Sequence, residues 1–240
     1  MKKIALSLVS AMLLSSNAFA GGHFVPVVEE PTVVETIIDP KYAVGLKVGT
    51  LGLGVDISRP ITDKLNIRLN LNGASYSDTQ CESDIEYDYD LTLASVGLLL
   101  DYYPMGNEFR VSAGAYYNAN EFELTGQPAN GAYNINGTTY TATQIGSLTG
   151  MVDFDELAPY IGIGWGNSTK KAGWGFSVDA GIIYHGDPNV ELTPTCGTAV
   201  SAALCAEITT NVEAERLDLL NELSDYKIYP VVSFGVTYTF

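Results

Sequence analysis

The amino-acid sequence predicts an all-β fold, an eight-stranded antiparallel up-and-down transmembrane β-barrel with long extracellular loops and one short helix before the last strand. Three observations lead to this prediction. Apolar residues alternate with small or polar ones in several segments, which is the period of a β-strand. The connections alternate between short and long after the first, as in barrels with tight turns on one side of the membrane. Aromatic residues gather toward strand ends, where two aromatic belts are expected at the water–lipid interfaces.

The first 41 residues are expected to lie outside the barrel. Residues 1–20 have the pattern of a secretory signal peptide, with Lys2 and Lys3, an apolar run over 4–14, and an A-x-A cleavage motif at 18–20. Residues 21–41 contain three prolines and three glutamates and are predicted to form a periplasmic lead-in, with a flexible linker favoured over a docking arm. The barrel domain is predicted to span 42–240.

The first four strands are predicted over 42–49, 51–60, 65–77 and 91–103. The alternation of acids with Ile85, Tyr87 and Tyr89 over 82–90 predicts that the fourth strand also runs beyond the membrane before entering it at Leu91. The apolar positions change parity at Gly49-Thr50, which indicates either a tight turn, the favoured reading, or a bulge in one long strand. Apolar residues occupy both parities within 91–103, and we expect a bulge near Ser95 that turns Val96, Leu98 and Leu100 outward.

The remaining strands are predicted over 108–124, 154–167, 173–186 and 226–240. Short turns are expected at 61–64, 104–107 and 168–172, and long loops at 78–88, 125–153 and 187–225. Within the loops, Asn136-Gly137 is typical of a hairpin. The segment 208–223 is predicted to be a helix with a capping box from Thr210 to Glu213.

The inward face of the predicted barrel carries three positive and three negative side chains. An eight-stranded barrel is only wide enough for side chains to fill it, and buried charges must pair. We therefore expect an ion-pair network, supported by Asn66, Asn70, Ser112 and Tyr116. A structural plug is favoured over a gated path for ions or small solutes, and the balanced signs argue against ion selectivity. The six charged residues are Lys47, Asp56, Arg68, Asp101, Arg110 and Asp179.

The chain is acidic, with 12 basic against 28 acidic residues and a formal net charge of −16. Nucleic acid is excluded as a partner, because phosphate binding needs clustered Lys and Arg. Divalent cations remain candidate partners, since carboxylates alternating on one strand can hold Ca²⁺ or Mg²⁺ and bridge lipopolysaccharide phosphates. A solvated strand edge is the favoured alternative. The candidate cation-binding residues are Asp84, Glu86, Asp88 and Asp90.

Three cysteines follow the predicted signal peptide. Cys196 and Cys205 lie nine residues apart and are the favoured disulfide, which leaves Cys81 free or paired elsewhere. No histidine accompanies them, so no metal site is predicted, and the sequence indicates no cofactor.

An enzymatic role is not favoured. The two histidines are His23, in the lead-in, and His185, at the end of a predicted strand. Asp187 and Ser201 could nominally assist His185, but nothing in the sequence fixes their geometry. No catalytic residue is predicted.

The chain resembles the small Gram-negative outer-membrane barrels typified by the transmembrane domain of outer membrane protein A and by outer membrane protein W. The resemblance rests on the signal peptide, the strand rhythm, Asp101-Tyr-Tyr-Pro104, the Gly-rich segment 162–166 and the terminal Tyr238-x-Phe240. It implies location in the outer membrane, contact with lipid and lipopolysaccharide, and recognition of Tyr238 and Phe240 by the barrel assembly machinery.

The resemblance is architectural, so it leaves several functions open. A structural or partner-binding surface barrel with a side-chain-filled lumen is favoured. The alternative is a narrow porin-like channel for small or apolar solutes. A lipid A-modifying enzyme at the rim is the least favoured.

Overall fold

The computed structural model describes residues 42–240, apart from 83–84, 129–130, 167–168 and 170. The predicted signal peptide, the lead-in and Asp84 therefore lie outside the described residues. Within this part of the chain, no helix is long and apolar enough to cross a bilayer.

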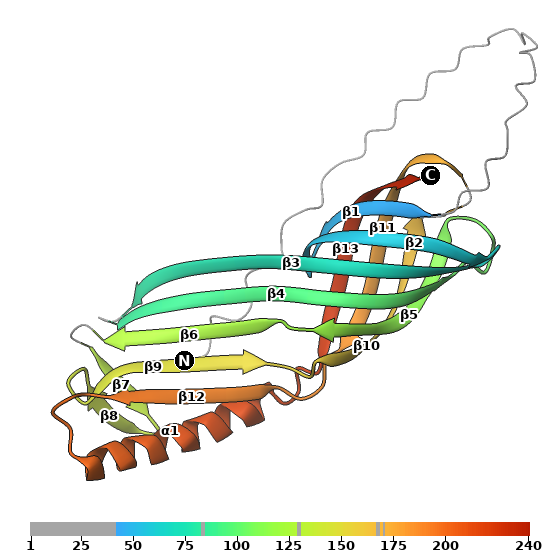
Figure 1. Ribbon diagram of the computed structural model, residues 1–240. Coiled ribbons are helices and arrows are strands. Elements are labelled where there is room, and N and C mark those ends of the chain that lie inside the picture. Colours follow the sequence, from blue (N-terminus) through green and yellow to red (C-terminus); the bar gives the residue numbers. More distant parts are fainter. Residues whose placement is uncertain (1–41, 83–84, 129–130, 167–168, 170) are drawn as a thin grey trace, which may run out of the picture. The chain divides into compact units, whose positions relative to one another are not determined.

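Eight antiparallel strands close into a barrel (Figure 1). Closure comes from pairing of the last strand with the first, in register from Ala43 opposite Thr239 to Gly49 opposite Ser233. The predicted fold class is confirmed. The barrel strands are β1 (Ala43–Gly49), β2 (Gly52–Thr62), β3 (Leu65–Glu82), β4 (Ile85–Tyr102), β5 (Phe109–Asn118), β10 (Leu157–Gly166), β11 (Gly173–Tyr184) and β13 (Ile228–Thr239).

Two local predictions for the first strands have opposite outcomes. Residues 42–60 form two strands joined by a tight turn at Thr50-Leu51, as favoured, and Gly52 follows with a φ of +94°. The bulge near Ser95 is wrong, because β3 and β4 pair without a register shift from Leu65 opposite Tyr102 to Glu82 opposite Ile85. Unbroken alternation in β4 instead turns Leu99 into the lumen, where it is buried.

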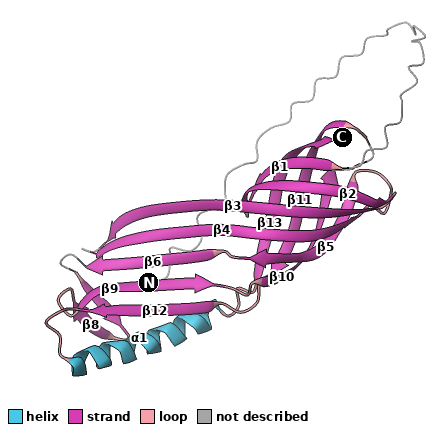
Figure 2. Cartoon of the chain, in the orientation of Figure 1, coloured by secondary structure: helices cyan, strands magenta, loops and turns pink. Residues whose placement is uncertain are grey.

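The barrel sheet continues beyond the barrel into a further region, called the extension below (Figures 1 and 2). Near Ser95 strand β5 leaves β4, and the upper part of β4 pairs with β6 instead, from Thr92 opposite Glu121 to Ile85 opposite Pro128. Strands β9 and β12 then follow in the sheet. The extension comprises residues 75–82 and 85–94 with β6 (Glu121–Pro128), β7 (Ala132–Ile135), β8 (Thr138–Thr141), β9 (Ile145–Asp153), β12 (Asn189–Cys196) and α1 (Ala202–Leu223).

The three segments predicted as long loops are thus largely strand and helix. Residues 78–82 and 85–88 extend the β3–β4 ribbon, 125–153 contain three strands and part of β6, and 187–225 contain β12 and α1. The hairpin at Asn136-Gly137 is confirmed, joining β7 to β8 with positive φ at both residues. The single predicted strand 108–124 is two strands, β5 and β6.

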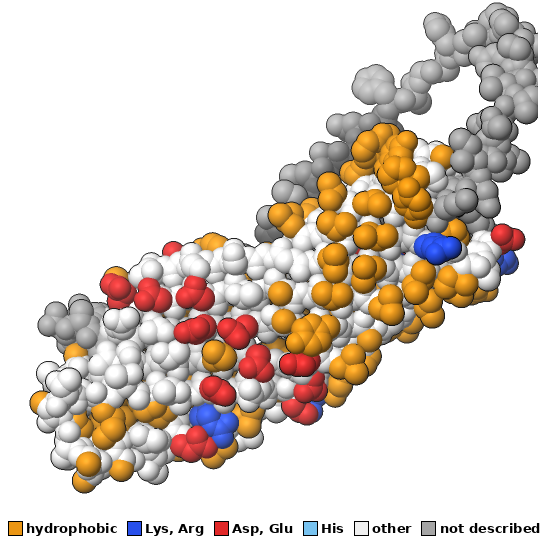
Figure 3. Space-filling model, in the orientation of Figure 1, with side chains coloured by type: hydrophobic (Ala, Val, Ile, Leu, Met, Phe, Trp, Pro, Cys, Tyr) orange, Lys and Arg blue, Asp and Glu red, His pale blue; other side chains and the backbone are white. Residues whose placement is uncertain are grey.

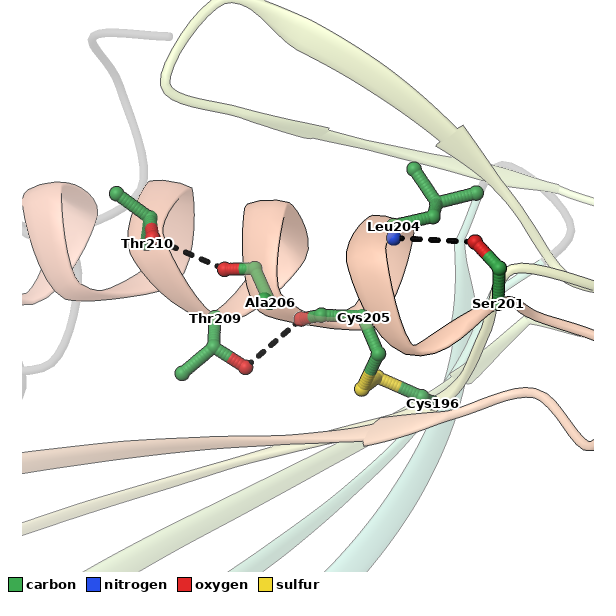
Figure 4. Close-up of a disulfide and its surroundings, with 7 residues drawn as sticks. All are labelled: Cys196, Ser201, Leu204, Cys205, Ala206, Thr209 and Thr210. Carbon is green, nitrogen blue, oxygen red and sulfur yellow. Dashed lines mark hydrogen bonds between the residues drawn. A yellow bond between two sulfur atoms is a disulfide. The ribbon is translucent and has the colours of Figure 1, made fainter.

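The helix is longer than predicted, and its N-cap is a different residue. It begins at Ala202, and the hydroxyl of Ser201 accepts a hydrogen bond of 3.2 Å from the Leu204 amide (Figure 4). The predicted capping box is wrong, because Thr210 lies inside the helix and donates its hydroxyl to the Ala206 carbonyl. Glu213 is bound instead to Arg216 on the same helix.

The two parts have opposite solvation. Large apolar side chains are exposed around the barrel, whereas Asp and Glu gather on the extension (Figure 3). The extension has an apolar core between its sheet, the β7–β8 hairpin and α1. That core consists of Ile85, Tyr133, Ile135, Tyr140, Ile145, Ile208 and Val212.

Candidate functional site

The barrel lumen holds the six charged residues that alternation places there. Arg68, on β3, is at the centre of the network and is 1% exposed. Its guanidinium lies 2.9 Å from Asp101, 3.3 Å from Asp179 and 3.5 Å from Asp56. One cation therefore contacts three carboxylates that come from three other strands.

The other two cations complete the charge balance. The Arg110 guanidinium lies 2.7 Å from Asp179 and donates to the carbonyl of Gly166. Lys47 lies 3.5 Å from Asp56. Three positive and three negative groups thus neutralise one another in the buried lumen, where an unpaired charge would be costly.

Neutral polar side chains supply further hydrogen bonds to the network. Ser112 donates to Asp101, Asn70 donates to Asp56, and the hydroxyl of Tyr116 donates to Asn70 at 2.9 Å. Asn66 lies nearer the short turns, where it donates to Tyr103 and accepts from Thr169.

Glycines on the barrel wall make room for the largest lumen side chains. A Cβ at Gly164 would lie 2.9 Å from the Arg110 guanidinium, and one at Gly97 would lie 2.5 Å from the Tyr116 ring. The Gly-rich β10 and the glycine in β4 are therefore packing features. They allow bulky groups to fill the lumen of a narrow barrel.

An apolar layer lies beyond the charged network, toward the extension. The rings of Tyr116 and Tyr160 meet edge to face at a centroid distance of 5.6 Å. The lumen thus consists of a charged layer and an apolar layer in series. The buried members of the apolar layer are Leu51, Leu99, Tyr116, Ala158, Tyr160, Ile183 and Val231.

The acidic residues of β4 lie on the outward face of the extension. Asp88 accepts a hydrogen bond of 2.7 Å from Thr79, and Asp90 accepts one from Ser77. Glu86 is exposed and lies opposite Cys81 and Gln127 on the two neighbouring strands. Residues two apart on a strand are about 7 Å apart, so these carboxylates do not converge on one point.

No group of three or more His, Cys, Asp or Glu side chains that could hold a metal ion occurs among the described residues. Asp84 is outside them, so the cation site stays a prediction. Nearby, hydrogen bonds from Gln80 and the Thr79 amide lower the pKa of Asp78, which favours its charged form without a cation.

A disulfide joins Cys196, at the end of β12, to Cys205, in the first turns of α1 (Figure 4). It attaches the helix to the edge of the extension sheet. Cys81 is exposed and not disulfide-bonded.

In the extension core, burial raises the pKa of Tyr133 to about 12.

The rim residues considered for catalysis are not brought together. His185 stacks on Phe154 at a centroid distance of 3.8 Å, and burial lowers the pKa of its imidazole against the opposing effect of Asp155. Asp187 forms an ion pair of 2.6 Å with Lys227, and Ser201 caps α1. No side-chain hydrogen bond between His185 and either Asp187 or Ser201 occurs in the part of the chain that the structure describes.

Tyr238 and Phe240 lie at the short-turn end of the barrel. Their rings are 4.8 Å apart, Phe240 also stacks on Tyr42 at 4.8 Å, and Tyr238 meets Trp174 edge to face. This cluster has the composition of an interfacial aromatic belt. Recognition of Tyr238 and Phe240 by assembly machinery stays a prediction.

Sequence reasoning missed two features, the apolar lumen layer and the folded extension. The alternation of Ile85, Tyr87 and Tyr89 with acids predicts a strand beyond the membrane, but not the sheet that β6, β9 and β12 add to it. Ile85, Tyr87 and Tyr89 form the apolar face of a strand whose other face is acidic, which is the pattern of a half-buried strand in water.

No family model and no curated protein matches the chain. Among solved structures, it is similar to CarO from Acinetobacter baumannii, with 24% identity and a TM-score of 0.54 over 86% of this chain and 100% of that one. CarO2 from the same organism has 24% identity and a TM-score of 0.54 over 84% and 99%. A major outer membrane protein from Thermus thermophilus has 14% identity and a TM-score of 0.41 over 83% and 98%. The likeness to the two Acinetobacter structures shows the fold.

The closed barrel, its apolar outer surface and its polar lumen together identify a β-barrel of the outer-membrane type. A bilayer accepts only structures whose backbone polar groups are all paired, and a closed barrel meets that condition.

Proposed function

We propose that this outer-membrane β-barrel is a closed, non-enzymatic anchor that holds the extension at the cell surface as a partner-binding or structural module. The observation that supports it best is the filled lumen. Arg68, Arg110, Asp101 and Asp179 are each at most 2% exposed. Moving an ion past them would require breaking ion pairs in a region of low dielectric constant.

The two lumen layers oppose two different classes of solute. An apolar solute would have to displace a charged network that is hydrogen-bonded to Ser112, to Asn70 and to the Gly166 carbonyl. An ion would have to enter the layer formed by Tyr116, Tyr160 and Leu99, where it would lose its hydration. The serial arrangement therefore favours a plug over the alternative, a narrow porin-like channel.

The extension supports a role at the surface. Its own apolar core and its disulfide give it a fixed surface, unlike that of a set of mobile loops. Its outward face carries Glu86, Asp90 and Glu121, which favour a cationic partner over an anionic one. A rim enzyme acting on lipid A is disfavoured by the separation of His185 from Asp187 and Ser201.

The test is conductance across a planar bilayer. Folding of the barrel is checked first, since a folded barrel stays folded in detergent until it is heated. The folded protein should then give no stable current steps. A general porin in the same bilayer is the positive control and should give them. Reproducible steps from the folded protein would contradict the closed-lumen proposal and favour the channel. A variant with Tyr160→Ala and Leu99→Ala widens the apolar layer and keeps the hydrogen bond from Tyr116 to Asn70. If it conducts and the parent does not, the layer is the barrier.

A further inference from the structure

An apolar cavity lies where the extension meets the barrel rim. Its volume is about 460 Å³, within the range of roughly 300–1,000 Å³ that is usual for small-molecule sites. Its floor includes Ile183 and Tyr229, which also belong to or pack against the apolar layer of the lumen. The cavity therefore borders the apolar layer of the lumen on the side of the extension.

Three separate elements supply the apolar walls. They are the inward faces of β4 and of its neighbouring strand β6, and the last turns of α1. Most of these side chains are half-buried, so they retain apolar surface that a ligand could cover. The wall residues are Leu91, Leu93, Phe122, Leu124, Leu219 and Leu223.

One polar side chain on the cavity wall lacks a protein partner. His185 is 6% exposed, and its ring rests against Phe154 and faces Tyr229. No hydrogen bond to either ring nitrogen occurs among the described residues. By contrast, the Asn118 side chain donates to the Asp155 carbonyl, and that of Asn120 accepts from the Ala94 amide. The ring nitrogens of His185 are not among the buried atoms without a partner, so they keep access to the cavity and can hydrogen-bond a ligand.

The apolar lining of the cavity selects against anions. Neither Lys nor Arg is among its described lining residues, and the nearby Asp155 acts on His185. A carboxylate or phosphate placed here would lose its hydration without gaining a cationic partner. An uncharged ligand meets no such penalty.

The cavity also lies beyond the lipid-facing part of β4. Leu91 faces the cavity, while its neighbour Asp90 is exposed on the outward face of the same strand. The outward face becomes apolar only from Val96 onward, where lipid begins. A ligand would therefore reach the cavity from the aqueous side rather than from the acyl-chain region.

We propose that this cavity binds one uncharged, mainly apolar small molecule from the medium, with its single hydrogen-bonding group directed at His185. The site goes beyond the closed-anchor function and does not depend on it, since binding at the rim requires neither an open nor a closed lumen.

The test uses the full chain in lipid nanodiscs with ¹³C-labelled Leu methyl groups and 1-octanol as the probe. The methyl signals of Leu91, Leu93 and Leu219 should shift saturably with octanol concentration. Lipid-facing Leu46 and Leu98 report octanol that simply partitions into the bilayer, and their signals should change without saturation. Octanoate, the anionic counterpart, should bind at least about tenfold more weakly.

Paired variants separate the cavity from its surroundings. Leu219→Trp fills the cavity and should abolish the saturable shifts of Leu91 and Leu93. Leu217→Trp adds the same ring to the exposed face of the same helix and should leave them unchanged. His185→Phe keeps the ring contacts but removes the hydrogen bond, and should weaken octanol binding about fivefold while leaving the cavity in place.

Three results would overturn the proposal. One is a shift of the cavity methyl signals in proportion to those of Leu46 and Leu98. Another is saturable binding that persists in Leu219→Trp. The third is nuclear Overhauser contact between cavity methyls and lipid chains before octanol is added, since the occupant would then be lipid. None of these results depends on conductance, so the closed-lumen proposal stands or fails separately.

Discussion

The two halves of β4 pair with β3 in one continuous register but have opposite solvation. In the barrel half, Leu98 and Leu100 point outward and are 57% and 47% exposed, while Asp101 points into the lumen and is fully buried. In the extension half, Asp88 and Asp90 are on that same outward face, and Leu91 points inward. The alternation is unbroken, so the chain changes from a lipid-facing to a water-facing strand without changing its geometry.

This difference shows that the alternation of side chains along a strand does not determine whether its outward face contacts lipid or water. Alternation decides which side of the sheet a residue occupies. The chemistry of each side decides whether that side meets lipid, water or protein. A single ribbon can therefore anchor a barrel in a bilayer and also form one side of an ordinary apolar core above it, as Figure 3 shows by the separation of apolar and acidic side chains.

The largest expected effect comes from removing the central cation of the barrel half. Arg68→Met leaves Asp56, Asp101 and Asp179 without their shared partner, and we expect a loss of about 3–5 kcal/mol in the free energy of unfolding. Urea unfolding in lipid vesicles, followed by tryptophan fluorescence, measures it, because both tryptophans, Trp165 and Trp174, are on barrel strands.

Arg59→Met is the matched control, since Arg59 is exposed on β2 and outside the network. It should change the stability by less than about 1 kcal/mol. Equal losses in the two variants would show that the lumen network does not stabilise the barrel.

One substitution made on each half of β4 tests the change of solvation directly. Leu98→Arg places a charge against lipid and should cost about 2–4 kcal/mol. Asp90→Arg places the same side chain on the same face of the same strand, but in water and opposite Glu123, and should change stability by no more than about 0.5 kcal/mol. The measurement is urea unfolding of both variants in vesicles.

If Asp90→Arg were as costly as Leu98→Arg, the lipid-facing surface would extend further along β4 than Val96. If Leu98→Arg were neutral, the outward face of the barrel would not be in contact with lipid.

The disulfide should matter to the extension only. Opening the ten-residue loop between Cys196 and Cys205 by Cys205→Ser removes about 2–3 kcal/mol of stabilisation on chain-entropy grounds. Amide hydrogen exchange should rise in β12 and α1, and the tryptophan-monitored unfolding of the barrel should stay unchanged. Cys81→Ser, at an exposed cysteine outside the disulfide, is the control. Barrel unfolding that follows the disulfide would mean that the two parts unfold as one unit.

Much of the barrel was predictable because period-2 alternation is a local signal. It places Lys47, Asp56 and Arg68 on one face without knowledge of their partners. Tight connections such as Thr50-Leu51 and Asn136-Gly137 are also encoded locally, by residues that tolerate positive φ or follow a change of parity.

The extension was not predictable in the same way, because it depends on pairing between distant segments. Glu123 on β6 lies opposite Asp90 on β4, and β12 joins β9 across 36 residues of chain at Asn189 and Asp153. The composition of these segments led to the prediction of loops, because Asp, Glu, Asn and Thr are frequent in them. The choice of Leu99 for the lumen was likewise decided by packing against Tyr116 and Tyr160 rather than by polarity.

The smallest expected effect is an alkaline transition confined to the extension. Burial raises the pKa of Tyr133 from 10.0 to about 12, so the folded extension favours the neutral phenol. The stabilisation is fully present below pH 10, where the unfolded chain is also neutral. It is lost as the pH rises from 10 toward 12, because the unfolded state releases its proton first.

Hydrogen exchange of β7 and α1 between pH 9 and 12, corrected for the intrinsic rate, measures this transition. Wild type should lose extension stability more steeply above pH 10 than Tyr133→Phe, which keeps the ring and has no proton to release. Tyr226→Phe, at an exposed position, should behave like wild type. Equal slopes for wild type and Tyr133→Phe would place Tyr133 in contact with water, and the extension core would then be open where the lumen of the barrel is closed.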